Sequence, residues 1–213
     1  MQFDFAALDT ATGYKLLTAT VTPRPIAWVT TCDAGGAVNA APYSFFNVVG
    51  SAPPTVVLGL LGDPERGFKD TARNIMATGD FVVNLVPEGL AEAMNITAVD
   101  APTGMNELDI AGLDSAPSAK VRPPRIAQSP VALECVLHSA VVTGPHQTLV
   151  IGRVVSMFID DAYVIDGPRG HVDNRALALV ARSFGSEYIR TQDRFSMDRP
   201  TWAGWHNRTP PKG

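Results

Sequence analysis

The sequence lacks several features that would assign it at once to a common class of protein. No apolar run approaches the roughly 18 residues that a membrane span requires, so we expect no membrane partner. With 17 basic and 21 acidic residues, the net charge of -4 argues against a nucleic-acid partner, which would require a basic face. The first residues contain neither the basic nor the apolar region of a signal peptide, so we expect a cytoplasmic protein.

Cysteine and histidine are also scarce. The two cysteines, Cys32 and Cys135, lie far apart, form no ligand motif and are expected to be free thiols. The four histidines show no metal-binding spacing, and each is interpreted as a surface or core residue: His138, His146, His171 and His206. The sequence therefore predicts no metal site.

The familiar catalytic motifs are missing. A P-loop is excluded at residues 62–71, because one residue separates Gly67 from Lys69 and Pro64 lies inside the loop. No glycine fingerprint of a dinucleotide-binding fold occurs, and Ser44 and Ser183 lack the glycines of a nucleophile elbow. Hydrolase and metalloenzyme interpretations are therefore weak.

Composition and apolar pattern instead predict a β-rich fold. The 213 residues include 17 prolines and 18 glycines, which suit short strands and turns better than a helical bundle. The longest strand patterns cover residues 130–143 and 148–159, among about seven or eight strands with helices inserted between them. We expect a mainly β fold: an antiparallel barrel with helical embellishments.

Local patterns predict the other elements. Near the N-terminus we expect a helical turn at 5–8 and a weak strand at 16–20. Two strands, 26–31 and 38–48, should be joined by a glycine turn at 33–36. The clearest helix covers 68–78 and ends at Gly79. We also expect a helix at 87–99, an irregular segment at 100–125 with one helical turn near 106–113, and a short helix within 171–183.

The strand at 38–48 has more polar residues than packing alone explains: Asn39, Tyr43, Ser44 and Asn47. A ring system such as isoalloxazine needs an apolar wall with converging hydrogen bonds, and Ala40, Ala41 and Pro42 would allow close backbone approach. Alternation places Asn39, Ala41 and Tyr43 on one face and Ala40, Pro42 and Ser44 on the other. Pro42 marks either a sheet edge or a bulge that reverses the faces, so both assignments remain open.

The start of the helix at 68–78 is a candidate anion site. Free backbone amides and the helix dipole attract an anion there, and Lys69, Thr71 and Arg73 would add donors. The alternative is plain capping by Asp70 or Thr71, with Lys69 solvated. Arg24, held extended between two prolines, has a similar alternative as a surface ion-pair partner.

Five motifs follow one another along the chain: Pro23-Arg-Pro-Ile-Ala-Trp-Val-Thr-Thr, Asn39-Ala-Ala-Pro-Tyr-Ser-Phe-Phe-Asn, Lys69-Asp-Thr-Ala-Arg-Asn-Ile, Glu107-Leu-Asp-Ile-Ala-Gly-Leu and Leu149-Val-Ile-Gly-Arg-Val-Val. They resemble motifs of the flavin reductase-like family, and within it of the flavoredoxin type with an FMN-binding split barrel. Their order covers about residues 14–190. We therefore expect one split-barrel domain at 1–190 and a C-terminal extension at 191–213.

The resemblance implies a homodimer that holds FMN non-covalently near its interface. The ring would meet the backbone around Ala40–Tyr43, beside the strand at 26–31, and the phosphate would meet some of Arg24, Thr30, Ser44, Lys69 and Thr71. The full set of implied cofactor-binding residues is Arg24, Ala27, Trp28, Thr30, Asn39, Ala40, Ala41, Pro42, Tyr43, Ser44, Lys69, Thr71 and Asn74.

The implied activity is that of an FMN-dependent oxidoreductase. NADH or NADPH would reduce the flavin, which would pass electrons to free flavin, a partner protein such as a flavin-dependent monooxygenase, or oxygen. No catalytic side chain is then required, because the flavin carries the chemistry. Two alternatives stay open: an electron carrier that another protein reduces, and a barrel without any cofactor.

Overall fold

Seven antiparallel strands form the body of the protein in the computed structural model, which describes residues 1–65, 67–102 and 104–206. Neighbouring strands pair in the order β3-β2-β6-β9-β10-β5-β4. The strands are β2 (Ala27–Cys32), β3 (Val38–Tyr43), β4 (Phe46–Ser51), β5 (Pro54–Leu61), β6 (Asp80–Asn84), β9 (Val131–Gly144) and β10 (Gln147–Ile159).

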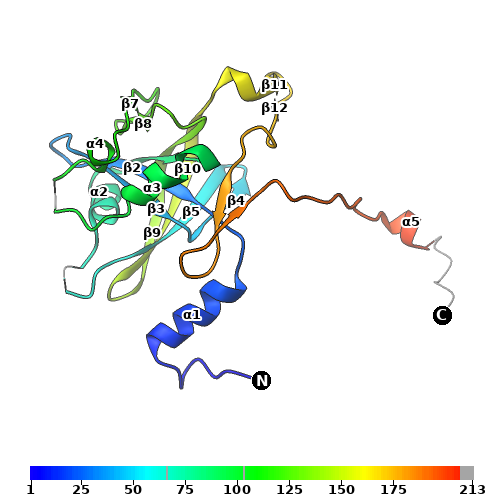
Figure 1. Ribbon diagram of the computed structural model, residues 1–213, viewed down its shortest axis with the longest axis horizontal. Coiled ribbons are helices and arrows are strands. Elements are labelled where there is room, and N and C mark those ends of the chain that lie inside the picture. The colour runs from blue at the N-terminus through cyan, green and yellow to red at the C-terminus, as the bar shows by residue number, and fades with distance from the viewer. Residues whose placement is uncertain (66, 103, 207–213) are drawn as a thin grey trace.

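This sheet curls around one apolar core (Figure 1). Ala27 near one edge of the sheet and Phe46 at the other belong to the same buried cluster as Leu58, Phe81 and Val150. Side chains from both edges can meet only if the sheet closes on itself. The predicted antiparallel barrel is therefore confirmed.

Gly152 on β10 shows how tightly this core is packed. A Cβ atom at this position would lie 2.3 Å from Cζ of Phe81, which is fully buried. Only glycine leaves room for the Phe81 ring there.

A second core covers the outer face of β2. Trp28 and Ile26 pack there against Met94 and Leu108, and Trp28 Nε1 donates to Thr97 Oγ1 at 2.8 Å. The covering elements are η1 (Glu88–Leu90), α3 (Ala91–Ile96) and α4 (Glu107–Ile110). Because β2 is covered on both faces, all six of its residues are buried.

Two peripheral elements leave the barrel from a small three-stranded sheet, in the order β1-β13-β14. Its strands are β1 (Arg24–Pro25), β13 (Val180–Arg182) and β14 (Tyr188–Arg190). Helix α1 (Thr10–Thr20) precedes β1, and an extended segment that ends in α5 (Trp202–His206) follows β14 (Figure 1).

The N-terminal prediction was wrong, because α1 occupies the place of the expected strand at 16–20. The Asp9 carboxylate accepts hydrogen bonds from Thr12 N at 2.9 Å and Thr12 Oγ1 at 2.7 Å. This cap satisfies an amide of the first turn and favours the helix despite several threonines.

Three further predictions need correction. The strand expected at 38–48 is interrupted at Ser44 and Phe45, where the chain passes from β3 to β4. No helix forms within 171–183, a fully described segment, because the Asp173 carboxylate accepts from the amides of Arg175 and Ala176 and closes a single turn. The helix expected at 87–99 is divided into η1 and α3 and ends at Ile96.

The strands expected at 130–143 and 148–159, the glycine turn at 33–36 and the helix that ends at Gly79 are confirmed. Helix α2 (Asp70–Thr78) ends at Gly79, whose φ of 80° is the left-handed conformation of a C-terminal cap. Gly36 forms the turn between β2 and β3 with a φ of 91°.

Five short elements complete the described fold. They are β7 (Ser115–Ala116), β8 (Arg125–Ile126), η2 (Asp161–Tyr163), β11 (Val164–Asp166) and β12 (His171–Val172).

Candidate functional site

A cavity of about 390 Å³ lies where the start of α2 faces the end of β3. Residues 61–63, 67 and 68 and the segment at 97–101 form its other walls. Of the residues predicted to bind the cofactor, those that line this cavity are Asn39, Ala41, Pro42, Tyr43, Ser44, Lys69 and Thr71. Residues from the two strongest sequence motifs, which are distant in the chain, therefore meet in one cavity.

The register of β3 shows that Pro42 causes no bulge. Pairing with β2 runs without a shift from Val38 to Tyr43, with Pro42 opposite Trp28. β3 is an edge strand of the main sheet, so it tolerates the missing amide hydrogen of Pro42. Ala40 packs into the second core, whereas residues of both alternating sets, Asn39, Ala41 and Tyr43 as well as Pro42 and Ser44, line the cavity.

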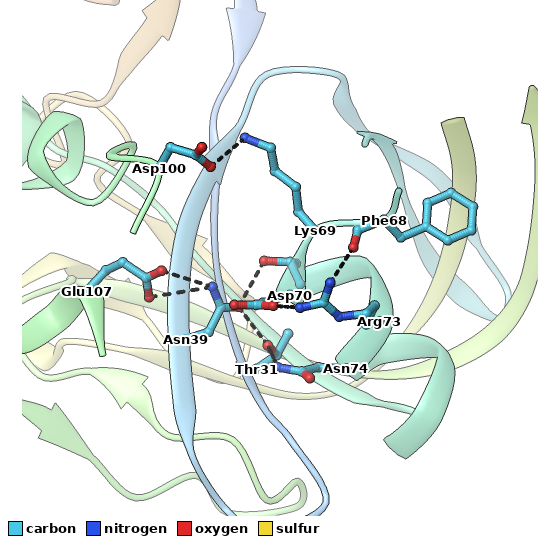
Figure 2. A network of polar contacts seen from close by, with 10 residues as sticks. Thr31, Asn39, Phe68, Lys69, Asp70, Arg73, Asn74, Asp100 and Glu107 are labelled. Carbon is cyan, nitrogen blue, oxygen red and sulfur yellow. Dashed lines mark hydrogen bonds and ion pairs between the residues drawn. The ribbon is translucent and has the colours of Figure 1, made fainter. Parts of the chain in front are cut away.

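Asn39 is the centre of a buried polar network (Figure 2). Its Oδ1 accepts from Thr31 Oγ1 at 2.8 Å and from Thr71 Oγ1 at 2.9 Å. Asn74 Nδ2 donates in turn to Thr31 Oγ1 at 2.9 Å. The network joins β2, β3 and α2, and it holds the first turn of α2 against the edge strand.

Glu107 extends this network from the opposite wall. Its carboxylate accepts from the amide of Ala40 at 2.9 Å and lies 3.5 Å from Asn39 Nδ2. The residue is only 7% exposed and lines the cavity. Glu107 thus satisfies an edge-strand amide and places a carboxylate beside the cavity wall.

Tyr43 brings a phenol group to the same wall. Burial raises the pKa of Tyr43 to about 12, and the nearby charge of Glu107 acts in the same direction. A hydrogen bond with Thr71 opposes these two effects. The phenol therefore stays protonated throughout the physiological range.

The start of α2 is open to an anion. Lys69 occupies the N-cap position, and within the described part of the chain no side chain caps the helix there. Lys69 Nζ lies 3.6 Å from the Asp100 carboxylate, and both side chains are about half exposed. Arg73 pairs with Asp70 and donates to the carbonyl of Phe68 at 2.8 Å (Figure 2). The first turn of α2 thus lines the cavity without the side-chain cap considered as the alternative.

Arg24 lies outside this cavity, in a buried position. Its guanidinium donates to the carbonyl oxygens of Thr18, Val21 and Ser183 at 2.6–2.7 Å. These bonds tie the end of α1 to the segment after β13. Its Nε is 3.5 Å from Ser44 Oγ, the one predicted site residue that it contacts.

The other predicted residues stand behind the cavity walls. Ala27 and Trp28 are fully buried in the two cores, and Ala40 packs beside Trp28. Thr30 Oγ1 donates to the carbonyl of Pro124 at 2.6 Å, and Asn74 Nδ2 donates to Thr31 Oγ1 at 2.9 Å. Of these residues, Trp28 is hydrogen-bonded to a residue of the cavity lining, Thr97, whereas Thr30 and Asn74 are bonded to residues that do not line the cavity.

Glu107 and Thr31 were missing from the predicted set of site residues. Glu107 is 68 positions from Asn39, so nothing local connects the two residues. A possible sequence signal was an acidic residue at the one helical turn of an otherwise irregular segment. The contact itself depends on how that segment folds back over β3.

Other kinds of site find no support in the described residues. No group of three or more histidine, cysteine, aspartate or glutamate side chains within them is suited to a metal ion. Both cysteines are buried and free. Among the described helices, none combines the length and apolar character that a membrane span needs.

Comparison with known proteins shows the family to which the chain belongs. The model of the flavin reductase like domain matches residues 19–176. The chain belongs to the flavin reductase-like family. Its fold, a mainly antiparallel split barrel with a few helices, is the one predicted.

Three similar proteins illustrate the relationship. A protein from Deinococcus radiodurans is 42% identical over 97% of this chain and 92% of its own length. The structure of 2-nitrobenzoate 2-nitroreductase NbaA from Pseudomonas fluorescens is 33% identical, covers 95% of this chain and 98% of that chain, and has a TM-score of 0.86. Nitrilotriacetate monooxygenase component B from Bacillus cereus is 30% identical, with 92% and 98% coverage and a TM-score of 0.87.

The cavity suits the flavin that this family implies. Its volume falls in the range of about 300–1,000 Å³ typical of small-molecule sites. Its lining combines polar groups at the start of α2 with apolar side chains at Pro42, Phe45 and Leu61. A ligand with both a phosphate and an aromatic ring would match this combination.

Proposed function

We propose that this cavity binds FMN and that the protein is an NAD(P)H-dependent flavin reductase. The observation that supports this most strongly is the meeting of the uncapped start of α2 with the Asn39 network in one cavity. A helix start attracts a phosphate, and the edge strand offers backbone groups to a ring. The family provides the flavin chemistry.

The binding roles follow from the polar and apolar groups that line the cavity. Lys69 and the amides of Asp70 and Thr71 would hold the phosphate, with Asn39 and Thr71 fixing the position of the helix. The backbone from Ala41 to Ser44 would meet the polar edge of the ring, with Tyr43 and Phe45 as its walls. Glu107 would act indirectly by holding the amide of Ala40.

The bound flavin would supply the chemistry by accepting a hydride from NADH or NADPH and passing electrons onward. The protein would bind and orient the two partners, and the raised pKa of Tyr43 keeps its phenol neutral meanwhile. The electrons would go to free flavin, oxygen or a partner protein. Similarity to a monooxygenase component B supports a monooxygenase as that partner. We further propose a homodimer and a cytoplasmic location.

Anaerobic titration tests the activity. The protein loaded with FMN should lose its visible flavin absorption within seconds of adding NADH or NADPH, and regain it on adding free flavin or oxygen. Retention of FMN without bleaching by either nicotinamide would favour the electron-carrier alternative. A protein that retains no added FMN would contradict the proposal.

A second experiment tests where the phosphate binds. Lys69→Ala should weaken FMN binding by about tenfold, because it removes one charged donor near the phosphate. The same variant should leave riboflavin affinity unchanged, since riboflavin has no phosphate. Lys120→Ala, at an exposed lysine distant from the cavity lining, is the matched control and should alter neither affinity.

A further inference from the structure

A second cavity, of about 570 Å³, lies beside helix α1, and we call it the α1 cavity. Residues of α1 form one wall, and Arg24, Ser44 and residues 182–185 form the rest. Tyr14 and Ser44 also line the cavity at the start of α2, called the α2 cavity below, so the two cavities adjoin. The volume of the α1 cavity is typical of a small-molecule site.

The α1 cavity collects positive charge. Lys15, Arg24 and Arg182 belong to its lining, and none of the described lining residues is acidic. Among the residues that the structure describes, no carboxylate forms an ion pair with any of these three cations. The exposed Glu187 contacts Ser183 Oγ at 3.5 Å but does not line the cavity. The cavity is therefore suited to an anion.

Arg24 carries a buried charge without a counter-charge. Its side chain is only 7% exposed, and a buried charge is costly unless it is paired. Of the five N–H groups of its guanidinium, four have acceptors: the carbonyls of Thr18, Val21 and Ser183, and Ser44 Oγ at 3.5 Å. These acceptors are neutral, so they satisfy donors without balancing the charge. An anion in the α1 cavity would balance it.

The small three-stranded sheet places a second arginine beside the first. β1 and β13 pair with Arg24 directly opposite Arg182. Like charges at directly opposite positions of an antiparallel pair destabilise it. Arg182 is held there by its own contacts, since its guanidinium lies 4.6 Å from the ring centroid of Tyr188 and donates to the carbonyl of Gly185. The fold thus holds two arginines together at one cavity, where a shared anion would relieve their repulsion.

Aromatic and apolar side chains complete the lining of the α1 cavity. Tyr14 is 49% exposed and Phe184 44% exposed, and both line the cavity together with Ala11. Aromatic rings bind other planar rings by stacking or edge contacts. The planar guanidinium group matches the geometry of a carboxylate. A ligand that has both a carboxylate and an aromatic ring would use the two kinds of group, whereas a small inorganic anion would leave the rings uncovered.

We propose that the α1 cavity binds a small aromatic carboxylate. The carboxylate would pair with Arg24 and Arg182, and the ring would lie against Tyr14 and Phe184. Because the two cavities adjoin, this ligand would lie next to any flavin bound in the α2 cavity. The inference goes beyond the proposed flavin site and does not require it, since the charge and the aromatic groups belong to the α1 cavity itself.

Calorimetric titration of the full chain with benzoate, first without flavin, tests the proposal. Benzoate should bind with one molecule per chain. Benzamide has the same ring without the charge and should bind at least about tenfold more weakly, because a hydrogen bond to a charged group contributes about 1.5–3 kcal/mol. Inorganic phosphate, which has the charge without the ring, should also bind at least about tenfold more weakly. Benzoate should still bind when FMN is present at a saturating concentration.

Two variants locate the ligand in the α1 cavity. Arg182→Gln should weaken benzoate binding at least about tenfold and leave benzamide binding unchanged. Arg182 is chosen because Arg24 also holds three backbone carbonyl groups. Phe184→Ala should weaken benzoate and benzamide binding equally, since both ligands have the ring. Arg190→Gln is the matched control: Arg190 lies on β14 of the same sheet, its side chain is 73% exposed, and it does not line the cavity. It should bind benzoate as the wild type does.

Several outcomes would overturn the proposal. They are absence of benzoate binding, equal affinity for benzamide or phosphate, and full benzoate affinity in Arg182→Gln. Loss of benzoate binding in the presence of FMN would place benzoate in the α2 cavity and would overturn it as well. The expected benzoate results in a chain that binds no FMN would support the α1 cavity and contradict only the flavin proposal.

Discussion

At the scale of single residues, the cavity depends on hydroxyl and amide groups that have little freedom to move. Thr71 is fully buried, and its hydroxyl is one of two donors to Asn39 Oδ1. This side chain lies in the first turn of α2, so its hydrogen bond fixes both the helix start and the amide of Asn39. A change here should therefore affect stability and ligand binding together.

Replacement of Thr71 by valine tests this double role. The substitution keeps the shape but removes the donor, so we expect a loss of about 1–2 kcal/mol in unfolding free energy. FMN affinity should fall several-fold, because the helix start is less firmly held. Thr71→Ser, which keeps the hydroxyl, should retain most of both properties in urea unfolding and FMN titration.

The control for this pair lies on the same helix. Thr78 Oγ1 donates to the carbonyl of Asn74 at 2.8 Å, at the end of α2 away from the cavity. Thr78→Val should leave FMN affinity unchanged. An equal loss of affinity in Thr78→Val would mean that general weakening of α2, and not the Asn39 contact, controls binding.

Tyr43 gives a prediction for alkaline pH. Its phenol has a pKa of about 12 in the folded protein against 10.0 for the ordinary group, mainly because it is buried. The unfolded chain therefore loses this proton first, so the stabilisation is complete below pH 10 and disappears as pH rises towards 12. Tyr43→Phe should lack this decline, which amounts to roughly 2 kcal/mol.

Unfolding free energies of the two proteins, compared between about pH 9 and pH 12, provide the measurement. Burial also raises the pKa of Cys135, from 9.0 to about 12, but this thiol is present in both proteins and cancels in the difference. Parallel curves for wild type and Tyr43→Phe would contradict the expected role of Tyr43.

At the scale of elements, the edge strand β3 needs a partner for its outward amide groups. α4 provides one, because the Glu107 carboxylate accepts from Ala40 N at 2.9 Å. An unpaired buried amide costs about 1–3 kcal/mol. The single turn of α4 thus protects the edge of the sheet at the point where the cavity opens.

Two substitutions of Glu107 separate its hydrogen bond from its charge. Glu107→Ala should lower the unfolding free energy by about 2 kcal/mol and accelerate hydrogen exchange of the Ala40 amide. Glu107→Gln keeps an acceptor oxygen and should protect that amide nearly as well. Asp109→Asn, an exposed acid on the same turn, should change neither quantity. Rapid exchange at Ala40 in the wild type would show that this bond does not persist in solution.

The helices and strands also show which local sequence patterns were sufficient to predict an element. β9 and β10 were predicted because long alternating patterns specify strands, and α2 because Gly79 marks its end. α1 was missed because its several threonines favour strands. The interruption of 38–48 was missed because Ser44 and Phe45 have no strong turn propensity, and the chain turns there to begin β4.

At the scale of the whole molecule, the barrel and the two motifs that meet at the cavity could be predicted from sequence. The motifs around Asn39 and Lys69 were both recognised, and the fold places them in one cavity. The contributions of Glu107 and Thr31 could not be predicted, since they depend on how distant segments pack. Arg24 is the opposite case, because its distinctive motif led to a predicted role in phosphate binding. In the structure its guanidinium instead donates to backbone carbonyl groups of α1 and Ser183.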